Sequence, residues 1–346
     1  MSAPRLPPPE DYVTPFTDHV YAVKHGVELR LRVWPSASPD PAPWVLWSHG
    51  GAWLFGLHED PTAWVVPGFH ARGYHVVSFT YRYAPIANIE DILTDGRDAH
   101  AWCVAHLPNL LRVDIERYVL AGDSAGGHLA TTLAQLVSPP PRAVLSDHGL
   151  VDLADAHYDT LRFSGSYTGE FGPEEIEAAI QDRDYTRAFA SVPEETRAKW
   201  PLGEVRRAFH APRVQYGRRE QLQADVKTAL AERGAWVAAV LHPERFSSSE
   251  QLKAYARKWS PLHMLDAAPS YPPTFFIHGE ADNIVPTAQS RAFAAKLRAR
   301  GVAVGGHYEP GEGHCYDEKF TSPNVEGYTR CVVACLDFIG AHVART

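Results

Sequence analysis

The chain has 346 residues, of which 45% are hydrophobic and 21% are charged, a composition typical of a globular protein with a packed core. Its formal net charge of -8 excludes the basic face that a nucleic-acid groove needs. No apolar run is long enough to span a membrane, residues 1–10 lack the pattern of a secretory signal, and the four cysteines form no CxxC pair. These features predict a cytoplasmic protein with no nucleic-acid partner and no membrane span.

Short apolar strands alternate with helical patterns over most of the chain. Residues 19–24 and 28–33 alternate between polar and apolar around His25-Gly26, which predicts an antiparallel hairpin. The later strands are almost continuously apolar and are separated by helices, which is typical of a mostly parallel sheet with helices on both faces. The predicted strands are residues 44–48, 74–80, 118–121, 143–146, 274–277 and 302–308, and the predicted helices are residues 89–106, 125–137, 288–300 and 325–343.

The middle of the chain, from Leu153 to Ala268, has a different pattern. Pro173 opens a helical turn and residues 221–233 are helical, but no strand is evident. We therefore predict an α/β fold in which residues 1–152 and 269–346 form one domain around a central sheet. Residues 153–268 are predicted to form a helical cap or lid inserted across one end of that sheet.

The motif GDSAG at residues 122–126 lies directly between a predicted strand and a predicted helix. A sharp turn from strand to helix puts its central residue in a strained conformation and needs small neighbours to avoid clashes. Such a turn would raise the hydroxyl of Ser124 above the sheet, at the N-terminus of the helix. The motif therefore predicts Ser124 as a nucleophile; the alternative is a glycine-rich helix start in which Ser124 is only a capping residue.

A serine hydroxyl needs a base, and the base needs an acid that orients it. In this architecture the three residues follow the order serine, acid, histidine. His314 lies on a glycine-rich loop between the last predicted strand and the terminal helix, and Asp282 follows the strand at residues 274–277. We predict His314 as the base and Asp282 as the acid. Glu280 is the alternative acid, whose other role would be to cap a turn.

Acyl transfer also needs donors for the oxyanion of the tetrahedral intermediate. The motif HGGAW at residues 49–53 follows the first predicted parallel strand, and its glycines allow the backbone to approach a reacting carbonyl. We predict the N–H groups of Gly50, Gly51 and Ala125 as these donors. The alternative for the motif is a plain His-Gly-Gly turn.

Three aromatic residues close to these motifs are candidates for the wall of an acyl pocket. They are Trp53, Phe55 and Tyr83, and each could equally pack in the core. The histidines show no HExxH or comparable metal spacing, and the glycine-rich segments lack the lysine of a phosphate-binding loop. We therefore expect neither a metal nor a cofactor.

Four motifs give the chain a family resemblance. They are HGGAW at residues 49–53, YRYAP at 81–85, GDSAGG at 122–127 and SPL at 260–262. Over residues 44–151 and 260–343 the chain resembles the hormone-sensitive-lipase-like branch of the α/β-hydrolase family, although that branch usually has leucine at the position of Tyr83 and a shorter distance between serine and acid. The HGGAW motif and residues 278–282 are also similar to formamidase and feruloyl-esterase relatives.

The resemblance implies an α/β-hydrolase fold and a carboxylesterase that needs no cofactor. It also implies that the substrate is a small-molecule ester with a short to medium acyl chain, cleaved through an acyl-enzyme on Ser124. Alternatives with the same three residues are a formamidase, amidase or peptidase, which differ in the leaving group, and an acyltransferase. A ligand receptor without activity is an alternative of another class. For the oligomeric state, a homodimer is the assembly we consider besides a monomer.

Overall fold

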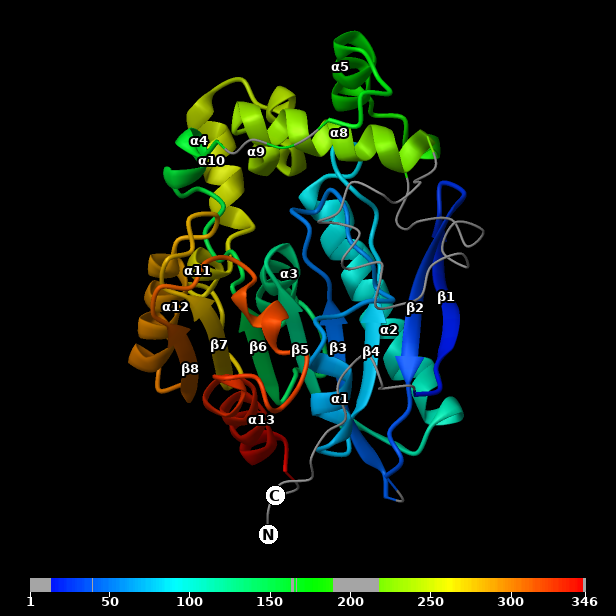
Figure 1. Cartoon of the computed structure of the whole chain (residues 1–346), viewed down its shortest axis with the longest axis vertical. Helices are drawn as coiled ribbons and strands as arrows, with labels where there is room; N and C mark the ends of the chain where they lie inside the picture. Colours follow the sequence, from blue (N-terminus) through cyan, green and yellow to red (C-terminus); the bar gives the residue numbers. More distant parts are fainter. Residues whose placement is uncertain (1–13, 39, 163–164, 166, 189–217, 345–346) are drawn as a thin grey trace.

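The computed structural model describes residues 14–38, 40–162, 165, 167–188 and 218–344, and an eight-stranded sheet lies at its centre (Figure 1). The strands are β1 (Thr17–Lys24), β2 (Val27–Trp34), β3 (Ala42–Ser48), β4 (His75–Phe79), β5 (Val113–Asp123), β6 (Ala143–Asp147), β7 (Thr274–Gly279) and β8 (Val304–Glu309). Their order across the sheet is β1-β2-β4-β3-β5-β6-β7-β8. The pairs β1–β2 and β2–β4 are antiparallel, and the other neighbours are parallel.

This arrangement confirms the predicted hairpin, the mostly parallel sheet and the α/β-hydrolase fold. One strand differs clearly from its prediction, because β5 begins at Val113 rather than at Tyr118. Its first five residues include Asp114, Glu116 and Arg117 and are only partly buried or exposed. Charged residues are interspersed with Val113 and Ile115 in this stretch, so it lacks the continuous apolar run by which the other central strands were predicted.

Helices cover both faces of the sheet. Helices α2 (Ile89–Leu110), α3 (Ala125–Leu133) and α12 (Thr287–Ala299) pack on one face, and α1 (Val65–His70) and α13 (Ala334–Val343) pack on the other. Consecutive residues of the central strands bury their side chains on opposite faces, as Leu120 and Val119 do. This explains why these strands are apolar at nearly every position. The predicted terminal helix, residues 325–343, begins later than expected, because residues 325–327 form a turn, and it consists of a π-helical turn, Thr329–Val333, followed by α13.

The described part of residues 153–268 contains helices and no strand. In Figure 1 most of these helices lie together beyond one end of the sheet. This segment contacts the loops that follow β3 and β4, since the Gln223 amide donates to the carbonyls of Leu54 and Ala84, at 2.7 Å each. The helical segments are α4 (His157–Thr160), α5 (Pro173–Gln181), α8 (Arg218–Arg233), α9 (Trp236–Leu241), α10 (Ser249–Lys258) and α11 (Pro261–Met264), with short 3₁₀ turns at Tyr185–Arg187 and Pro243–Arg245.

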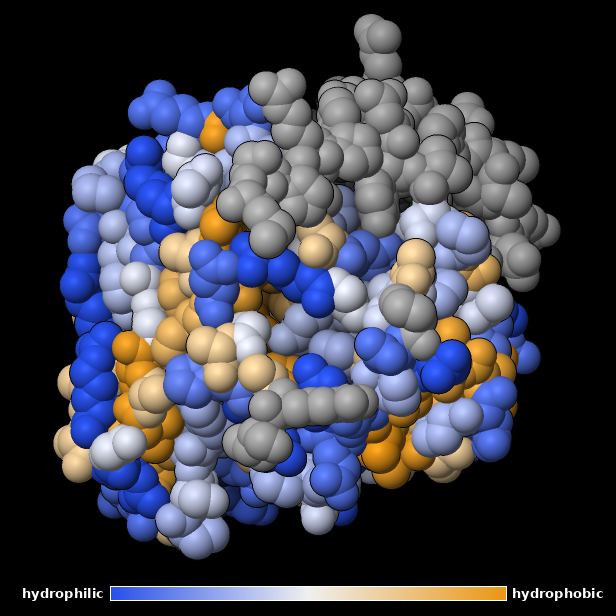
Figure 2. Space-filling view, turned by 90° about the horizontal axis from the view of Figure 1, so that it is seen from below, coloured by the Kyte–Doolittle hydropathy of each residue, from blue (hydrophilic) through white to orange (hydrophobic). Residues whose placement is uncertain are grey.

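The surface gives no sign of a broad apolar belt on the face drawn in Figure 2. There, hydrophilic and hydrophobic residues are mixed, and the hydrophobic areas are separated by hydrophilic ones. None of the helices in the described ranges has the length and apolarity that crossing a bilayer requires.

Glycines permit the tight connection between β5 and α3. A Cβ atom on Gly126 would lie 1.9 Å from the Ser48 carbonyl oxygen, and one on Gly122 would lie 2.4 Å from the Gly126 carbonyl oxygen. The Ser48 oxygen belongs to the backbone of β3 and the Gly126 oxygen to that of α3, so neither atom can move away easily. The small residues of the GDSAG motif are therefore required by the close approach of α3 to β3.

We predict that Gly126→Ala lowers the free energy of unfolding by about 1–3 kcal/mol, because the added methyl group has no space. The matched control is Gly340→Ala in α13, where a Cβ atom would have no neighbour within 4 Å. That change should leave stability unaltered or raise it by up to about 1 kcal/mol. Urea denaturation of both variants measures this; equal effects would contradict the account of the turn.

Candidate active site

Ser124 occupies the turn between β5 and α3 with φ 51° and ψ -117°, a backbone conformation that non-glycine residues adopt only at a cost in energy. Two backbone hydrogen bonds hold this turn. The Ser124 N–H donates to the Asp147 carbonyl at 2.8 Å, and the Ser124 carbonyl accepts from the His128 N–H at 3.1 Å. The sharp turn predicted from the GDSAG motif is thus present, and Ser124 lines a cavity at the end of the sheet.

His314 lies in the loop after β8 and joins Ser124 to Asp282. Its Nε2 is 3.0 Å from the Ser124 Oγ, and its Nδ1 is 2.7 Å from Asp282 Oδ2. The structure therefore brings together the three side chains that the sequence singled out. With the proton on Nδ1 donated to the carboxylate, Nε2 is the atom that can accept the hydroxyl proton.

Asp282 is held as a buried anion by several donors. The N–H groups of Ile284 and Val285 each donate to Oδ1 at 2.9 Å, and His278 Nε2 lies 3.1 Å from Oδ2. Burial opposes the charged form, but the hydrogen bonds from His278 and His314 outweigh it and keep the pKa of Asp282 well below its ordinary value. A carboxylate fixed in this way can orient the imidazole and stabilise its protonated form.

The alternative acid, Glu280, lies elsewhere. Its side chain is 40% exposed and pairs with Arg291 on α12. It is therefore a surface residue, and the structure favours Asp282 of the two candidates. Glu280 and Asp282 differ because the turn after β7 directs only the second of them toward the loop that carries His314.

The structure corrects the predicted oxyanion donors at Gly50. Its N–H donates to the Asp123 carboxylate at 3.1 Å, so it is not available to a reacting carbonyl in this geometry. Gly51 lines the cavity, with φ 100°, and Ala125 is the first residue of α3, whose N–H has no partner within the helix. Ala52, which the sequence analysis passed over, also lines the cavity and lies in the left-handed region at φ 54°.

Aromatic packing fixes the loop that carries these residues. The His49 ring stacks on Tyr81, with 4.4 Å between ring centroids, and the Tyr81 hydroxyl donates to the His49 carbonyl at 3.0 Å. Burial lowers the pKa of His49 to about 4, so this ring is neutral at pH 7. The Tyr83 hydroxyl donates to the Gly56 carbonyl at 2.6 Å, at the far end of the same loop.

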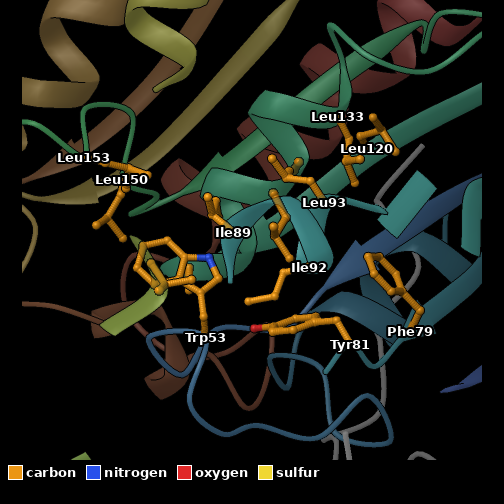
Figure 3. Packing of buried hydrophobic residues seen from close by; sticks show 14 of the residues in the cluster. Trp53, Phe79, Tyr81, Ile89, Ile92, Leu93, Leu120, Leu133, Leu150 and Leu153 are labelled. Atoms are coloured by element: carbon orange, nitrogen blue, oxygen red, sulfur yellow. The ribbon is translucent and has the colours of Figure 1, made fainter. Parts of the chain in front are cut away.

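Two of the three predicted pocket residues are therefore core residues. Trp53 is fully buried, close to Tyr81 in Figure 3, and stacks on Trp236 of α9 with 6.1 Å between ring centroids. Tyr83 supports the loop and is absent from the residues that line the cavity. Their aromatic character reflects packing, because an indole and a phenol ring fill the space between loop, sheet and cap. Phe55 does line the cavity, as predicted.

The cavity beside Ser124 has a volume of about 380 Å³, a size that suits a small ligand. Its walls come from the loops after β3, β7 and β8, from the turn between β5 and α3, and from residues 153–268. Lys227 and Trp236 line it together with Phe55 and Ser124, and the Lys227 ammonium lies 4.6 Å from the centre of the Phe55 ring. Burial lowers the pKa of Lys227.

A second group of polar side chains lies behind His314, and the sequence analysis missed it. Asp147 is the last residue of β6, His148 follows it, and Asp317 lies three residues after His314; all three are buried. His148 Nδ1 is 2.9 Å from Asp147 Oδ1, and the His148 ring lies 4.5 Å from the His314 ring. The available signal was the pair Asp147-His148 at the carboxyl end of a parallel strand, next to the nucleophile turn.

Metal binding is geometrically open to some of these residues. The donor atoms of His148, His314 and Cys315 lie within 4.8 Å of one another, as do those of Asp147, His148 and Asp317. However, both ring nitrogens of His314 already contact Ser124 and Asp282. A metal on His314 would therefore break the contacts that define the site.

Two family models match the chain in succession. Residues 45–202 match a model described as alpha/beta hydrolase fold, and residues 225–339 match the prolyl oligopeptidase family. Among solved structures, an esterase of Pyrobaculum calidifontis is similar at 21% identity and a TM-score of 0.60, over 97% of this chain and 88% of its own. Esterase B of Lactobacillus Rhamnosis is similar at 15% identity and a TM-score of 0.62, over 98% and 88%. The first of these models and the solved structures agree with the α/β-hydrolase fold of this chain.

The curated relatives are much longer proteins. The non-reducing polyketide synthase Preu6 of Preussia isomera is 28% identical over 86% of this chain, and the non-reducing polyketide synthase ausA of Aspergillus calidoustus is 27% identical over 99% of it. The chain spans only 13% and 15% of the lengths of these two proteins.

The electrostatics of His314 give a prediction that is independent of any substrate. Burial opposes protonation of its ring, but the charge of a Cys315 thiolate and the hydrogen bond to Asp282 outweigh burial and raise its pKa to about 9. The neutral ring, which is the form that can accept a proton, therefore accumulates as pH rises through about 9. Asp282→Asn removes the anion that favours the protonated ring, so the pKa of His314 should fall.

An NMR titration of the histidine ring protons, assigned with His314→Gln, measures this shift. Glu280→Gln is the matched control, and it should leave the His314 titration within about 0.3 pH units of the native curve because Glu280 pairs with Arg291 instead. Equal shifts in the two variants would show that the contact with Asp282 does not raise the pKa of His314.

Proposed function

We propose that the protein is a serine hydrolase that cleaves a carboxylic ester through an acyl-enzyme on Ser124. The observation that carries the proposal is the continuous contact from the Ser124 Oγ through His314 to Asp282, at 3.0 Å and 2.7 Å. A hydroxyl, an imidazole and a buried carboxylate in this order are the parts that acyl transfer needs.

The steps follow from the positions of these groups. His314 Nε2 takes the Ser124 proton as the Oγ attacks the acyl carbon, and the protonated ring then gives that proton to the leaving alcohol. A water molecule, deprotonated by the same nitrogen, attacks the acyl-enzyme and releases the acid. Asp282 keeps the ring oriented and stabilises its charge in both steps.

The N–H groups of Gly51, Ala52 and Ala125 are the donors that we propose for the oxyanion. Gly51 and Ala52 belong to the wall of the cavity, and Ala125 follows the nucleophile directly at the helix N-terminus. Losing one such donor typically costs roughly 3–4 kcal/mol of transition-state stabilisation. The Gly50 N–H has a supporting role instead, because its hydrogen bond to Asp123 holds the loop against the nucleophile turn.

We propose that residues 153–268 act as a cap that sets substrate choice. Lys227 and Trp236 of this segment line the cavity together with Ser124. A cavity of about 380 Å³ accommodates a short or medium acyl group better than a long one. A cytoplasmic location remains part of this proposal.

A thioester is the second candidate substrate. The observation that favours it is the similarity to two polyketide synthases. Regions of these proteins align with 86% and 99% of this chain. The same serine would then accept a polyketide acyl group from a thiol rather than from an alcohol. The triad serves either leaving group, so the choice between them depends on the cavity.

The test compares wild type and Ser124→Ala on p-nitrophenyl acetate, butyrate and octanoate, and on the butyryl thioester of N-acetylcysteamine. Wild type should hydrolyse the short esters, and Ser124→Ala should lower kcat by about 10³-fold or more because no nucleophile remains. Ser249→Ala, at an exposed position of α10, is the matched control and should retain full activity.

The relative rates decide between the two substrate classes. Faster turnover of the butyryl thioester than of the butyrate ester, after correction for their uncatalysed rates, would favour the second candidate. A wild-type chain that turns over none of these substrates, or a Ser124→Ala chain that turns them over normally, would refute the proposal.

A further inference from the structure

Cys315 directly follows His314 and has a histidine of its own. It lies in the left-handed region at φ 60°, lines the same cavity as Ser124, and its Sγ is 3.5 Å from His148 Nε2. The imidazole of His148 is thus placed against the thiol as that of His314 is placed against the Ser124 hydroxyl. The cavity therefore has two nucleophilic atoms on its wall, each next to a different imidazole.

Carboxylates complete this second arrangement. His148 is 2% exposed, and its Nδ1 lies 2.9 Å from Asp147 Oδ1 and 3.6 Å from Asp317 Oδ1. Asp147 and Asp317 are fully buried, and the Trp64 indole N–H donates to Asp317 at 2.9 Å. A buried imidazole between carboxylates and a thiol is stabilised in its protonated form, and the proton that it needs can come from the thiol.

The two imidazole rings beside the thiol favour its ionised form, whereas burial and Asp317 raise the pKa of Asp147 behind them. Burial raises the pKa of Cys315, but the imidazoles of His314 and His148 outweigh it and lower that pKa below its ordinary value. Burial opposes protonation of His148, yet Cys315 and Asp147 raise its pKa well above the ordinary value. The other ionisable groups near the thiol are Asp282 and Asp317, behind the two rings, and Asp60, Lys227 and Glu318 on the cavity wall.

We propose that Cys315 is a thiol-modification site, at which a thiolate formed by proton transfer to His148 reacts with small disulfides that enter the Ser124 cavity. The thiolate attacks one sulfur of the disulfide, a new S–S bond forms to Cys315, and the other sulfur leaves as a thiolate that takes the proton from His148. The disulfide is the oxidant, and the released thiol is its reduced half. A second thiol reverses the reaction.

The modification closes the serine site. The adduct occupies a cavity of about 380 Å³ on the residue next to His314, so an acyl group can no longer reach Ser124. This consequence rests on the proposed esterase function. The reactivity of Cys315 itself does not, because it is read as a covalent change in mass.

The chain contains its own controls. Cys103, Cys331 and Cys335 are fully buried, and burial raises the pKa of each. They should not react in the folded protein. Labelling of the native chain by a small disulfide should therefore be confined to Cys315, and all four cysteines should react once the chain is unfolded.

The experiment uses 2,2′-dithiodipyridine with the full native chain in the presence of EDTA, with release of thiopyridone as the rate signal and peptide mapping as the site signal. We expect one fast thiol per chain, at Cys315, whose rate changes less than about fivefold between pH 6 and pH 8. An ordinary thiol of pKa about 8.5 gains about 70-fold in thiolate over that range, and the urea-unfolded chain should show this slope. His148→Gln should restore the ordinary slope at Cys315.

Ester hydrolysis should fall in proportion to labelling and return with dithiothreitol, and the turnover that Cys315→Ser retains should not respond to the disulfide. An ordinary pH slope at native Cys315, or a thiol that reacts only after unfolding, would overturn the proposal whether or not His148→Gln folds. A thiol that EDTA alone uncovers would overturn it in favour of a metal site. Full labelling with unchanged turnover would show that the adduct does not block Ser124. A chain that hydrolyses no ester would refute the proposed function, and the labelling result would then decide the reactivity of Cys315 by itself.

Discussion

The contact between the Ser124 Oγ and His314 Nε2 joins residues that are 190 positions apart, and much of the fold serves to keep it at 3.0 Å. On one side, the turn after β5 needs glycines because α3 approaches the backbone of β3 closely. On the other side, the loops after β7 and β8 bring Asp282 and His314 to the same edge of the sheet. Parallel strands make this convergence natural, since their carboxyl ends all lie at one edge.

Burying the charge of Asp282 costs free energy, and hydrogen bonds from neighbouring groups compensate for that cost. Asp282 receives two backbone N–H groups besides the imidazole rings, so its charge is hydrogen-bonded without help from solvent. Asp147, His148 and Asp317 form a second buried group of ionisable side chains, and the His148 ring lies 4.5 Å from the His314 ring. The two groups adjoin at His314 and Cys315, so a change in the charge of the thiol changes the pKa of His314.

Much of this could be predicted from the sequence because the signals are local. The hairpin, the apolar strands and the GDSAG turn are encoded in short stretches, and the order serine, acid, histidine follows from the strands that carry them. The predictions for Gly50, Trp53 and Tyr83 were wrong in detail because sequence shows that a residue lies near a loop, but not whether its N–H or ring faces the cavity or the core. The N–H of Gly50 is engaged by Asp123, 73 positions away.

The pairing of Cys315 with His148 was beyond prediction for the same reason. Its two members are 167 positions apart and belong to no motif. The choice between Glu280 and Asp282 also needed coordinates, since both residues follow β7 and only the geometry of the turn separates a surface ion pair from a buried hydrogen bond.

The central claim is that the fold makes Ser124 a nucleophile. Reaction of the native chain with a fluorophosphonate, followed by intact-mass analysis and peptide mapping, tests this most directly, because phosphonylation requires an activated hydroxyl but no particular substrate. The account predicts one adduct per chain, on Ser124, that is absent from Ser124→Ala and slowed strongly in His314→Gln. An unlabelled native chain, or equal labelling of the Ser124→Ala variant, would contradict it.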